Sequence, residues 1–114
     1  MKLIIGGRSS GKTEYVKAHF IDEKGNADFD IIENVNDIAR ELFEKGFDYE
    51  EAANIIINKY GDSILLTDEV GNGIVPIDNN EREFREWIGR VQIILARKAD
   101  EVIRVICGLG QKIK

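Results

Sequence analysis

The sequence predicts an α/β fold with a small, mainly parallel sheet, and two observations carry this prediction. Short apolar runs alternate along the chain with longer stretches in which apolar residues recur at helical spacing. The first apolar run also leads directly into a glycine-rich loop and then a helical stretch, an order typical of α/β proteins that bind phosphate groups. A length of 114 residues suits one domain, so we expect a single domain over residues 1–114.

The first elements follow from this alternation. A strand at about residues 2–6 precedes a helix at about 12–21. The segment 22–28 contains glycine and asparagine and is interpreted as a turn, which leads to a second strand at 29–33.

Two further helices are predicted from their ends. Asn34 or Asn36 is expected to cap a helix that stops at Gly46. Asp48 and Glu51 have capping-box spacing and should begin the next helix.

The second half of the chain completes the expected order β-α-β-α-α-β-α-β. An apolar strand at 64–69 ends in acidic residues, and the glycines and the proline of 70–76 indicate a loop. The longest helix begins near Asn79 or Asn80, and a last strand covers 102–107. The apolar stripe of that helix is interpreted as core packing and consists of Phe84, Trp87, Ile88, Val91, Ile94 and Leu95.

The glycine-rich loop matches the phosphate-binding pattern G-x-x-x-x-G-K-[ST]. Its residues are Gly6, Gly7, Arg8, Ser9, Ser10, Gly11, Lys12 and Thr13. Such a loop directs backbone N–H groups at phosphate oxygens, and the following helix directs the positive end of its dipole at the same anion. Lys12 is predicted to lie against the β- and γ-phosphates, and the Thr13 hydroxyl to bind Mg²⁺. The alternative is a chance match between a strand and a helix. The sequence thus predicts a P-loop NTPase-like three-layer sandwich that binds ATP or GTP with Mg²⁺.

The acidic end of the 64–69 strand is predicted to complete this site. In P-loop enzymes the strand that carries the metal-associated aspartate lies beside the first strand, so Asp68 is expected near Thr13 and the metal ion. Glu69 is then placed to orient a nucleophile or accept its proton, and Lys12, Asp68 and Glu69 are the catalytic candidates. A solvated strand end is the alternative interpretation of Glu69.

Composition excludes several function classes. The formal net charge of −5 and the absence of a basic stripe argue against nucleic-acid binding. No apolar run is long enough for a signal peptide or a membrane span, so we expect a cytoplasmic protein. The single cysteine, Cys107, lies in an apolar run and is expected to be a buried thiol in a reducing compartment.

Four stretches of the chain carry a resemblance to a known family. The loop at 6–13 is close to G-G-A-R-S-G-K-S, and residues 69–76 look like E-V-G-x-G-I-V-P. Residues 84–92 follow F-R-D-x-x-G-x-x-N with Gln92 at the asparagine position, and 99–109 is similar to A-D-E-V-x-x-V-x-x-G-L. These are motifs of the adenosylcobinamide kinase/adenosylcobinamide-phosphate guanylyltransferases of cobalamin biosynthesis, and the chain resembles that family over roughly half of its length.

The resemblance implies a phosphotransferase with adenosylcobinamide as the acceptor, and it implies a homo-oligomer. The family usually has asparagine where this chain has Asp68, and its members are usually longer. Their guanylylated histidine lies in a segment that has no counterpart here. His19 does not match that position, so guanylyl transfer through a covalent histidine is not expected.

Two hypotheses of function remain open at this point. One is a compact kinase in which Arg8, Arg82 or Arg85 stabilises charge on the transferred group, although each of these arginines has a solvated surface position as its alternative role. The other is a homologue that binds or slowly hydrolyses nucleotide and acts as a switch or a partner subunit.

Overall fold

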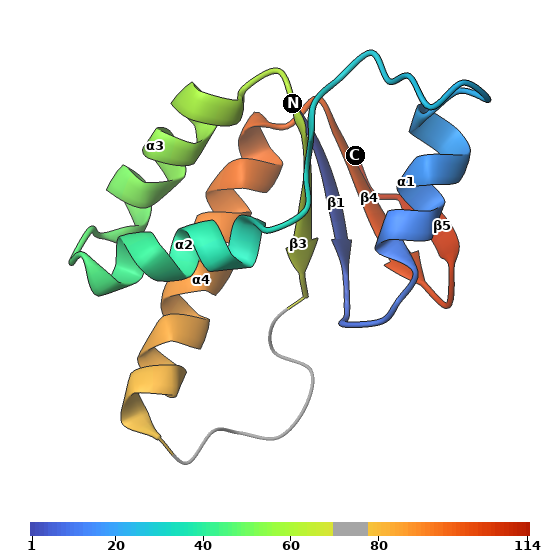
Figure 1. Cartoon of the computed structure of the whole chain (residues 1–114). Helices are drawn as coiled ribbons and strands as arrows, with labels where there is room; N and C mark the ends of the chain where they lie inside the picture. The colour runs from blue at the N-terminus through green and yellow to red at the C-terminus, as the bar shows by residue number, and fades with distance from the viewer. Residues whose placement is uncertain (70–77) are drawn as a thin grey trace.

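The computed structural model describes residues 1–69 and 78–114, and it confirms the predicted fold class (Figure 1). The strands are β1 (Lys2–Gly6), β2 (Ile31–Ile32), β3 (Ile64–Asp68), β4 (Glu101–Ile106) and β5 (Leu109–Lys112). The helices are α1 (Lys12–Phe20), α2 (Val35–Glu44), α3 (Tyr49–Tyr60) and α4 (Asn79–Lys98). In this part of the chain the strands form one sheet in the order β2-β3-β1-β4-β5, parallel except for the antiparallel β5.

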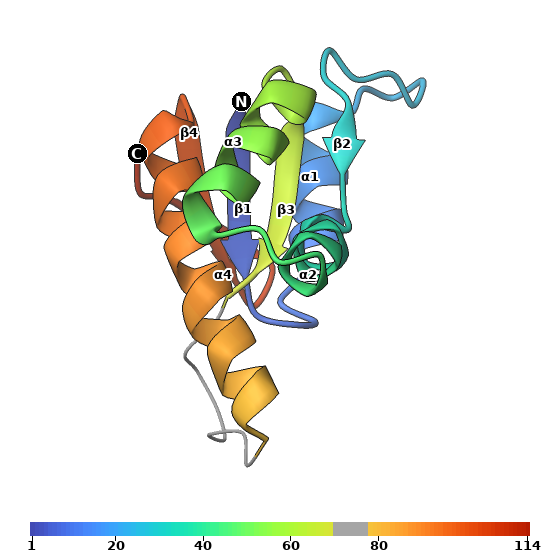
Figure 2. The ribbon, with the colours of Figure 1, turned by 90° about the vertical axis from the view of Figure 1, so that its left-hand side faces the viewer.

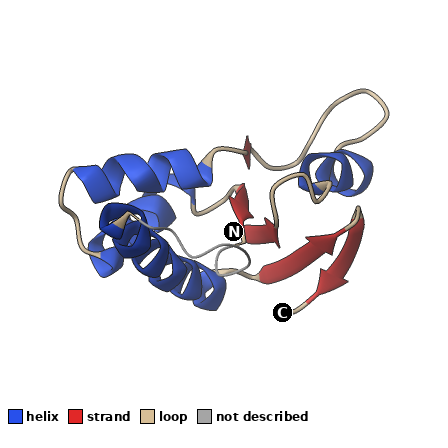
Figure 3. Ribbon diagram, turned by 90° about the horizontal axis from the view of Figure 1, so that it is seen from below, coloured by secondary structure: helices blue, strands red, loops and turns tan. Residues whose placement is uncertain are grey.

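The sheet lies between two helical layers, as Figures 1 to 3 show from three directions. Helices α2, α3 and α4 cover one face and bury a core that includes Leu3, Leu65 and Val102. Helix α1 covers the other face, where Ile4 and Val105 are buried. Neighbouring residues of a strand point to opposite faces of the sheet. Leu3 therefore packs under α2 to α4, and Ile4, the next residue, packs under α1.

The strand register brings three chain segments together at one edge of the sheet. Strand β1 lies between β3 and β4, and Gly6 at its end pairs with Asp68 on one side and Val105 on the other. The ends of β1, β3 and β4 therefore meet at the carboxyl edge, which is at the bottom of Figure 1. This is the edge at which open α/β sheets bind ligands.

Several predicted elements are confirmed by the structure. The Asp48 side chain accepts a hydrogen bond from the Glu51 backbone N–H at 2.8 Å, which is one half of the predicted capping box and caps α3. Helix α4 is the longest described helix and buries most of its predicted apolar stripe. The Trp87 indole in that stripe donates to the Phe47 carbonyl at 3.0 Å, which satisfies its one polar atom.

Other elements differ in part from their predictions. Strand β2 has only two residues, because pairing with β3 ends at Leu65. The N-cap of α2 is Asn34, but its side chain makes no capping bond, and Asn36 turns toward β3 instead. Strand β5 was not predicted, and it makes a tight hairpin with β4.

The prediction of a buried cysteine is also wrong. Cys107 is an exposed free thiol in the β4–β5 turn, where its φ is 51°. Strand β4 ends one residue before it, at Ile106, and that residue is already 46% exposed. Among the helices that the structure describes, none combines the length and apolar character needed to cross a membrane.

Candidate nucleotide site

The phosphate-loop residues form a tight curl between β1 and α1. Ser9 and Gly11 have φ angles of 64° and 90°, and the Ser10 N–H donates to the Gly7 carbonyl at 3.1 Å. Left-handed residues inside such a turn make a concave set of N–H groups that suits an anion. Helix α1 begins directly after the curl without a side-chain cap, so N–H groups of its first turn remain available to a phosphate.

The β4–β5 turn packs against the phosphate loop and supports it. The Gly108 N–H donates to the Ser10 carbonyl at 2.7 Å. A Cβ atom at Gly11 would lie 3.0 Å from the Gly108 Cα, so close packing as well as the positive φ favours glycine there. The hydroxyl of Ser10 is a buried polar atom that has no hydrogen-bond partner among the described residues. The loop therefore holds a donor that a ligand oxygen can satisfy.

Lys12 and Asp68, two of the catalytic candidates, lie together. The Lys12 ammonium donates to the Asp68 carboxylate at 3.0 Å and to the carbonyls of Gly6 and Gly7 at 2.9 Å each. The lysine side chain is 11% exposed and the aspartate side chain 46% exposed. The three N–H groups of the ammonium are therefore all used, and the ammonium must release at least one of these acceptors to bind a phosphate.

Glu69 pairs with an arginine that sequence reasoning did not select. Its backbone N–H donates to the Gly6 carbonyl at 2.8 Å, which holds the residue beside the end of β1. Its carboxylate accepts from Arg104 of β4, with Oε1 2.8 Å from Nη2 and Oε2 3.3 Å from Nε. A charged residue inside the apolar run Val102–Ile106 was the available signal. The pair spans the sheet across β1.

Two polar side chains, Asn36 and Gln92, hold the backbone of Asp68, and the Thr67 hydroxyl links them. Asn36 Oδ1 accepts from the Thr67 hydroxyl at 2.8 Å and from the Asp68 N–H at 2.9 Å. Gln92 Nε2 donates to the Thr67 hydroxyl at 2.7 Å and to the Asp68 carbonyl at 2.8 Å. Thr67 and Gln92 are buried, so this cluster is a satisfied polar network within the core.

A cavity of about 320 Å³ opens beside the phosphate loop. It is lined by loop residues, by both members of the ion pair and by the end of β4: Gly7, Ser9, Ser10, Glu69, Arg104, Val105, Ile106 and Cys107. Its place at the carboxyl edge suits a phosphorylated ligand or its acceptor.

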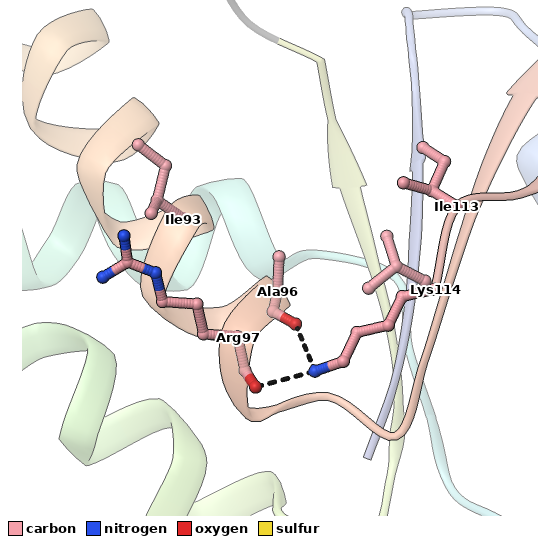
Figure 4. Close-up of a pocket in the computed structure, with 6 residues that line it drawn as sticks. Ile93, Ala96, Arg97, Ile113 and Lys114 are labelled. Atoms are coloured by element: carbon pink, nitrogen blue, oxygen red, sulfur yellow. Dashed lines mark hydrogen bonds between the residues drawn. The ribbon is translucent and has the colours of Figure 1, made fainter.

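A second cavity, of about 440 Å³, lies near the opposite edge of the sheet (Figure 4). It is lined between α4 and the C-terminal residues by Ile93, Ala96, Arg97, Val102, Ile113 and Lys114. The Lys114 ammonium donates to the carbonyls of Ala96 and Arg97 at the end of α4. Val102 is near the start of β4, whereas the phosphate loop follows the end of the neighbouring strand β1, so this cavity lies toward the other end of these strands.

The residues predicted to hold Mg²⁺ have suitable chemistry. Thr13 is half-buried in the first turn of α1 and Asp68 ends β3, and both offer the oxygen ligands that Mg²⁺ prefers. The described residues contain no group of three or more acidic, histidine or cysteine side chains placed to bind a metal.

The remaining candidates lie at the periphery or outside the described residues. His19 is exposed near the end of α1, with Nδ1 2.9 Å from the Tyr15 carbonyl and its ring stacked on Tyr15. Arg8 is exposed in the loop, and Arg82 and Arg85 lie in the first two turns of α4. The predicted loop 70–76 lies outside the described residues.

Together the parallel sheet, the phosphate loop and the acidic end of β3 define a P-loop NTPase-like α/β protein. A family model described as cobinamide kinase / cobinamide phosphate guanyltransferase matches residues 35–113. The chain belongs to this family. The matched range includes Asp68, Glu69, Gln92 and Arg104 and begins after the phosphate loop.

Two curated proteins are similar to part of the chain. The bifunctional adenosylcobalamin biosynthesis protein CobU of Salmonella typhimurium is 53% identical over 51 residues, and that of Escherichia coli is 51% identical over 51 residues. In both cases the aligned segment covers 45% of this chain and 28% of the relative. The similarity therefore spans less than a third of each relative's length.

Proposed function

We propose that the protein binds Mg²⁺ with ATP or GTP and transfers the γ-phosphate to adenosylcobinamide. One observation carries this proposal: adjacent parallel strands bring Lys12 of the phosphate loop within 3.0 Å of Asp68. Phosphoryl transfer depends mainly on positioning and on neutralising charge, which a phosphate loop, a lysine, a metal and an acidic residue supply. Family membership supports cobinamide as the acceptor.

In this proposal each site residue has a separate task. The loop N–H groups and the Lys12 ammonium bind phosphate oxygens, and Thr13 and Asp68 hold the Mg²⁺ ion, which screens the phosphate charge. Glu69 faces the cavity beside the loop and orients the acceptor hydroxyl. We also propose that the protein acts in the cytoplasm as a homo-oligomer, in line with the expectation from its sequence.

The test is product formation by the purified chain. The chain is incubated with Mg²⁺, ATP or GTP, and adenosylcobinamide, and adenosylcobinamide phosphate is sought by mass spectrometry. We expect product with the parent and with Lys17→Ala, whose lysine is exposed on the same helix, and none with Lys12→Ala. The Escherichia coli relative in the same assay controls for the quality of the acceptor.

A second candidate function is a nucleotide-dependent switch or partner subunit without cobinamide chemistry. Its motivation is that the aligned segment covers 28% of each relative, so the alignment carries the likeness to these bifunctional enzymes over that part of their length alone. Nucleotide binding without product, while the relative makes product in a parallel tube, would select this function over the kinase.

A further inference from the structure

Within the described residues, no strand pairs with the end of β3 on its β2 side. In a strand, the N–H and C=O groups of successive residues point to alternate sides. The Glu69 N–H points to β1, where it donates to Gly6, so the N–H and C=O of Asp68 point to the β2 side. Strand β2 ends at Ile32, which pairs with Leu65, so it does not extend to Asp68.

Side chains from two helices take the place of the missing strand. Asn36, in the first turn of α2, accepts the Asp68 N–H, and Gln92, in the middle of α4, donates to the Asp68 carbonyl. Thr67 joins the two, because its hydroxyl accepts from Gln92 and donates to Asn36. Each of these hydrogen bonds is 2.7 to 2.9 Å long, so the peptide of Asp68 is fixed from both directions.

We infer that Asn36 and Gln92 are positioning residues that hold the Asp68 carboxylate where it binds Mg²⁺. This inference rests on the proposed function, because it assumes that Asp68 is a partner of the metal. A carboxylate at the free end of a strand otherwise has several rotamers and a flexible backbone, and ordering it would reduce metal affinity. Outer partners of this kind change metal affinity by about 10- to 100-fold when they are removed.

The fixed peptide also matters because Asp68 has a competing partner. Its carboxylate is paired with Lys12 without nucleotide, and the same carboxylate must serve the ion once Lys12 moves to a phosphate. A backbone held by Asn36 and Gln92 lets the side chain exchange partners without a rearrangement of the strand. The network thus keeps the Asp68 backbone in the same place whether its carboxylate is paired with Lys12 or bound to Mg²⁺.

The test compares nucleotide affinity with and without Mg²⁺, by calorimetry, in Asn36→Ala and Gln92→Met. We expect the Mg²⁺-dependent gain in affinity to fall by about 10-fold or more, while Mg²⁺-free affinity stays within about twofold of the parent. Matched controls are Asn54→Ala on α3 and Gln111→Met on β5, which change the same residue types at exposed positions. Thr67→Val removes the joining hydroxyl with little change in volume and serves where a first variant fails to fold.

A thermodynamic cycle distinguishes positioning from general destabilisation. In an Asp68→Ala background, Gln92→Met should cause no further loss of the Mg²⁺-dependent gain, because the group that it positions is absent. If the parent shows a Mg²⁺-dependent gain in nucleotide affinity and the folded variants retain it in full, this inference is overturned and the proposed metal site is not. A parent that shows no such gain would overturn both the inference and the proposed metal site.

Discussion

Replacing Asp68 by alanine should change nucleotide affinity in opposite directions with and without Mg²⁺. We expect the Lys12 ammonium to leave Asp68 when it binds a phosphate, so that without Mg²⁺ nucleotide binding works against this ion pair. The alanine variant has no such pair, and its lysine is free to meet the phosphate. With Mg²⁺, the same variant lacks the carboxylate that we assign to the ion.

The magnitudes follow from the exposure of the pair. Its aspartate is 46% exposed, so the pair is close to the surface class, whose contributions are at most about 1 kcal/mol. Loss of the pair should therefore strengthen Mg²⁺-free binding by up to about fivefold. The desolvation of Lys12, which is 11% exposed, favours the upper end of that range. Loss of a metal partner should weaken the Mg²⁺-dependent gain by at least about 10-fold.

Isothermal titration of ATP in excess EDTA and in excess Mg²⁺ measures both quantities on one preparation. Lys12→Ala is the informative comparison, because it should lose affinity under both conditions. Weaker Mg²⁺-free binding by Asp68→Ala would refute the view that the pair competes with nucleotide. An unchanged Mg²⁺-dependent gain would remove Asp68 from the metal site.

Three further predictions concern chemistry, packing and pH. Glu69→Ala should leave nucleotide affinity unchanged and reduce turnover, measured by product formation; full turnover would exclude this residue from the mechanism. Gly11→Ala should destabilise the fold by about 1–2 kcal/mol in thermal unfolding because its φ is 90°, whereas Gly7→Ala, with open space around it, should have little effect. The hydrogen bond from Arg40 lowers the pKa of Glu81 below its ordinary 4.5, so this pair stabilises the fold above that pH and loses its effect as the pH falls through the lowered pKa. Glu81→Gln should accordingly lower the melting temperature at pH 7, and the deficit should shrink as the pH falls below 4.5 and the parent's carboxylate becomes protonated; an equal deficit at every pH would contradict a charge-dependent role.

Local signals explain which parts of the molecule the sequence could predict. The phosphate loop is a contiguous motif, and its short distance from β1 fixes its place at the carboxyl edge. The capping pair Asp48 and Glu51 acts within one helical turn. Predictions of this kind depend on neighbours along the chain, and the structure confirms the elements that they specify.

Contacts between distant segments explain what the sequence could not predict. Arg104 is one charge in an apolar strand, and its partner Glu69 lies 35 residues away. Asn36 is a residue type that often caps helices. Because β2 is too short to pair with Asp68, the Asn36 side chain instead accepts a hydrogen bond from the Asp68 N–H. Cys107 follows an apolar run, and only the unpredicted hairpin with β5 places it in an exposed turn.

The two acidic residues at the end of β3 serve opposite sides of the sheet, which makes their roles separable. Asp68 follows the buried Leu66 by two positions and meets Lys12 of α1 on the α1 face. Glu69 meets Arg104, which follows the buried Val102 by two positions and so lies on the face that α2 to α4 cover. One carboxylate is therefore directed to Lys12 and the other to the cavity beside the loop. A strand that delivers two adjacent carboxylates to two faces can bind the metal with one and orient an acceptor with the other, so we expect loss of Asp68 to change binding and loss of Glu69 to change turnover.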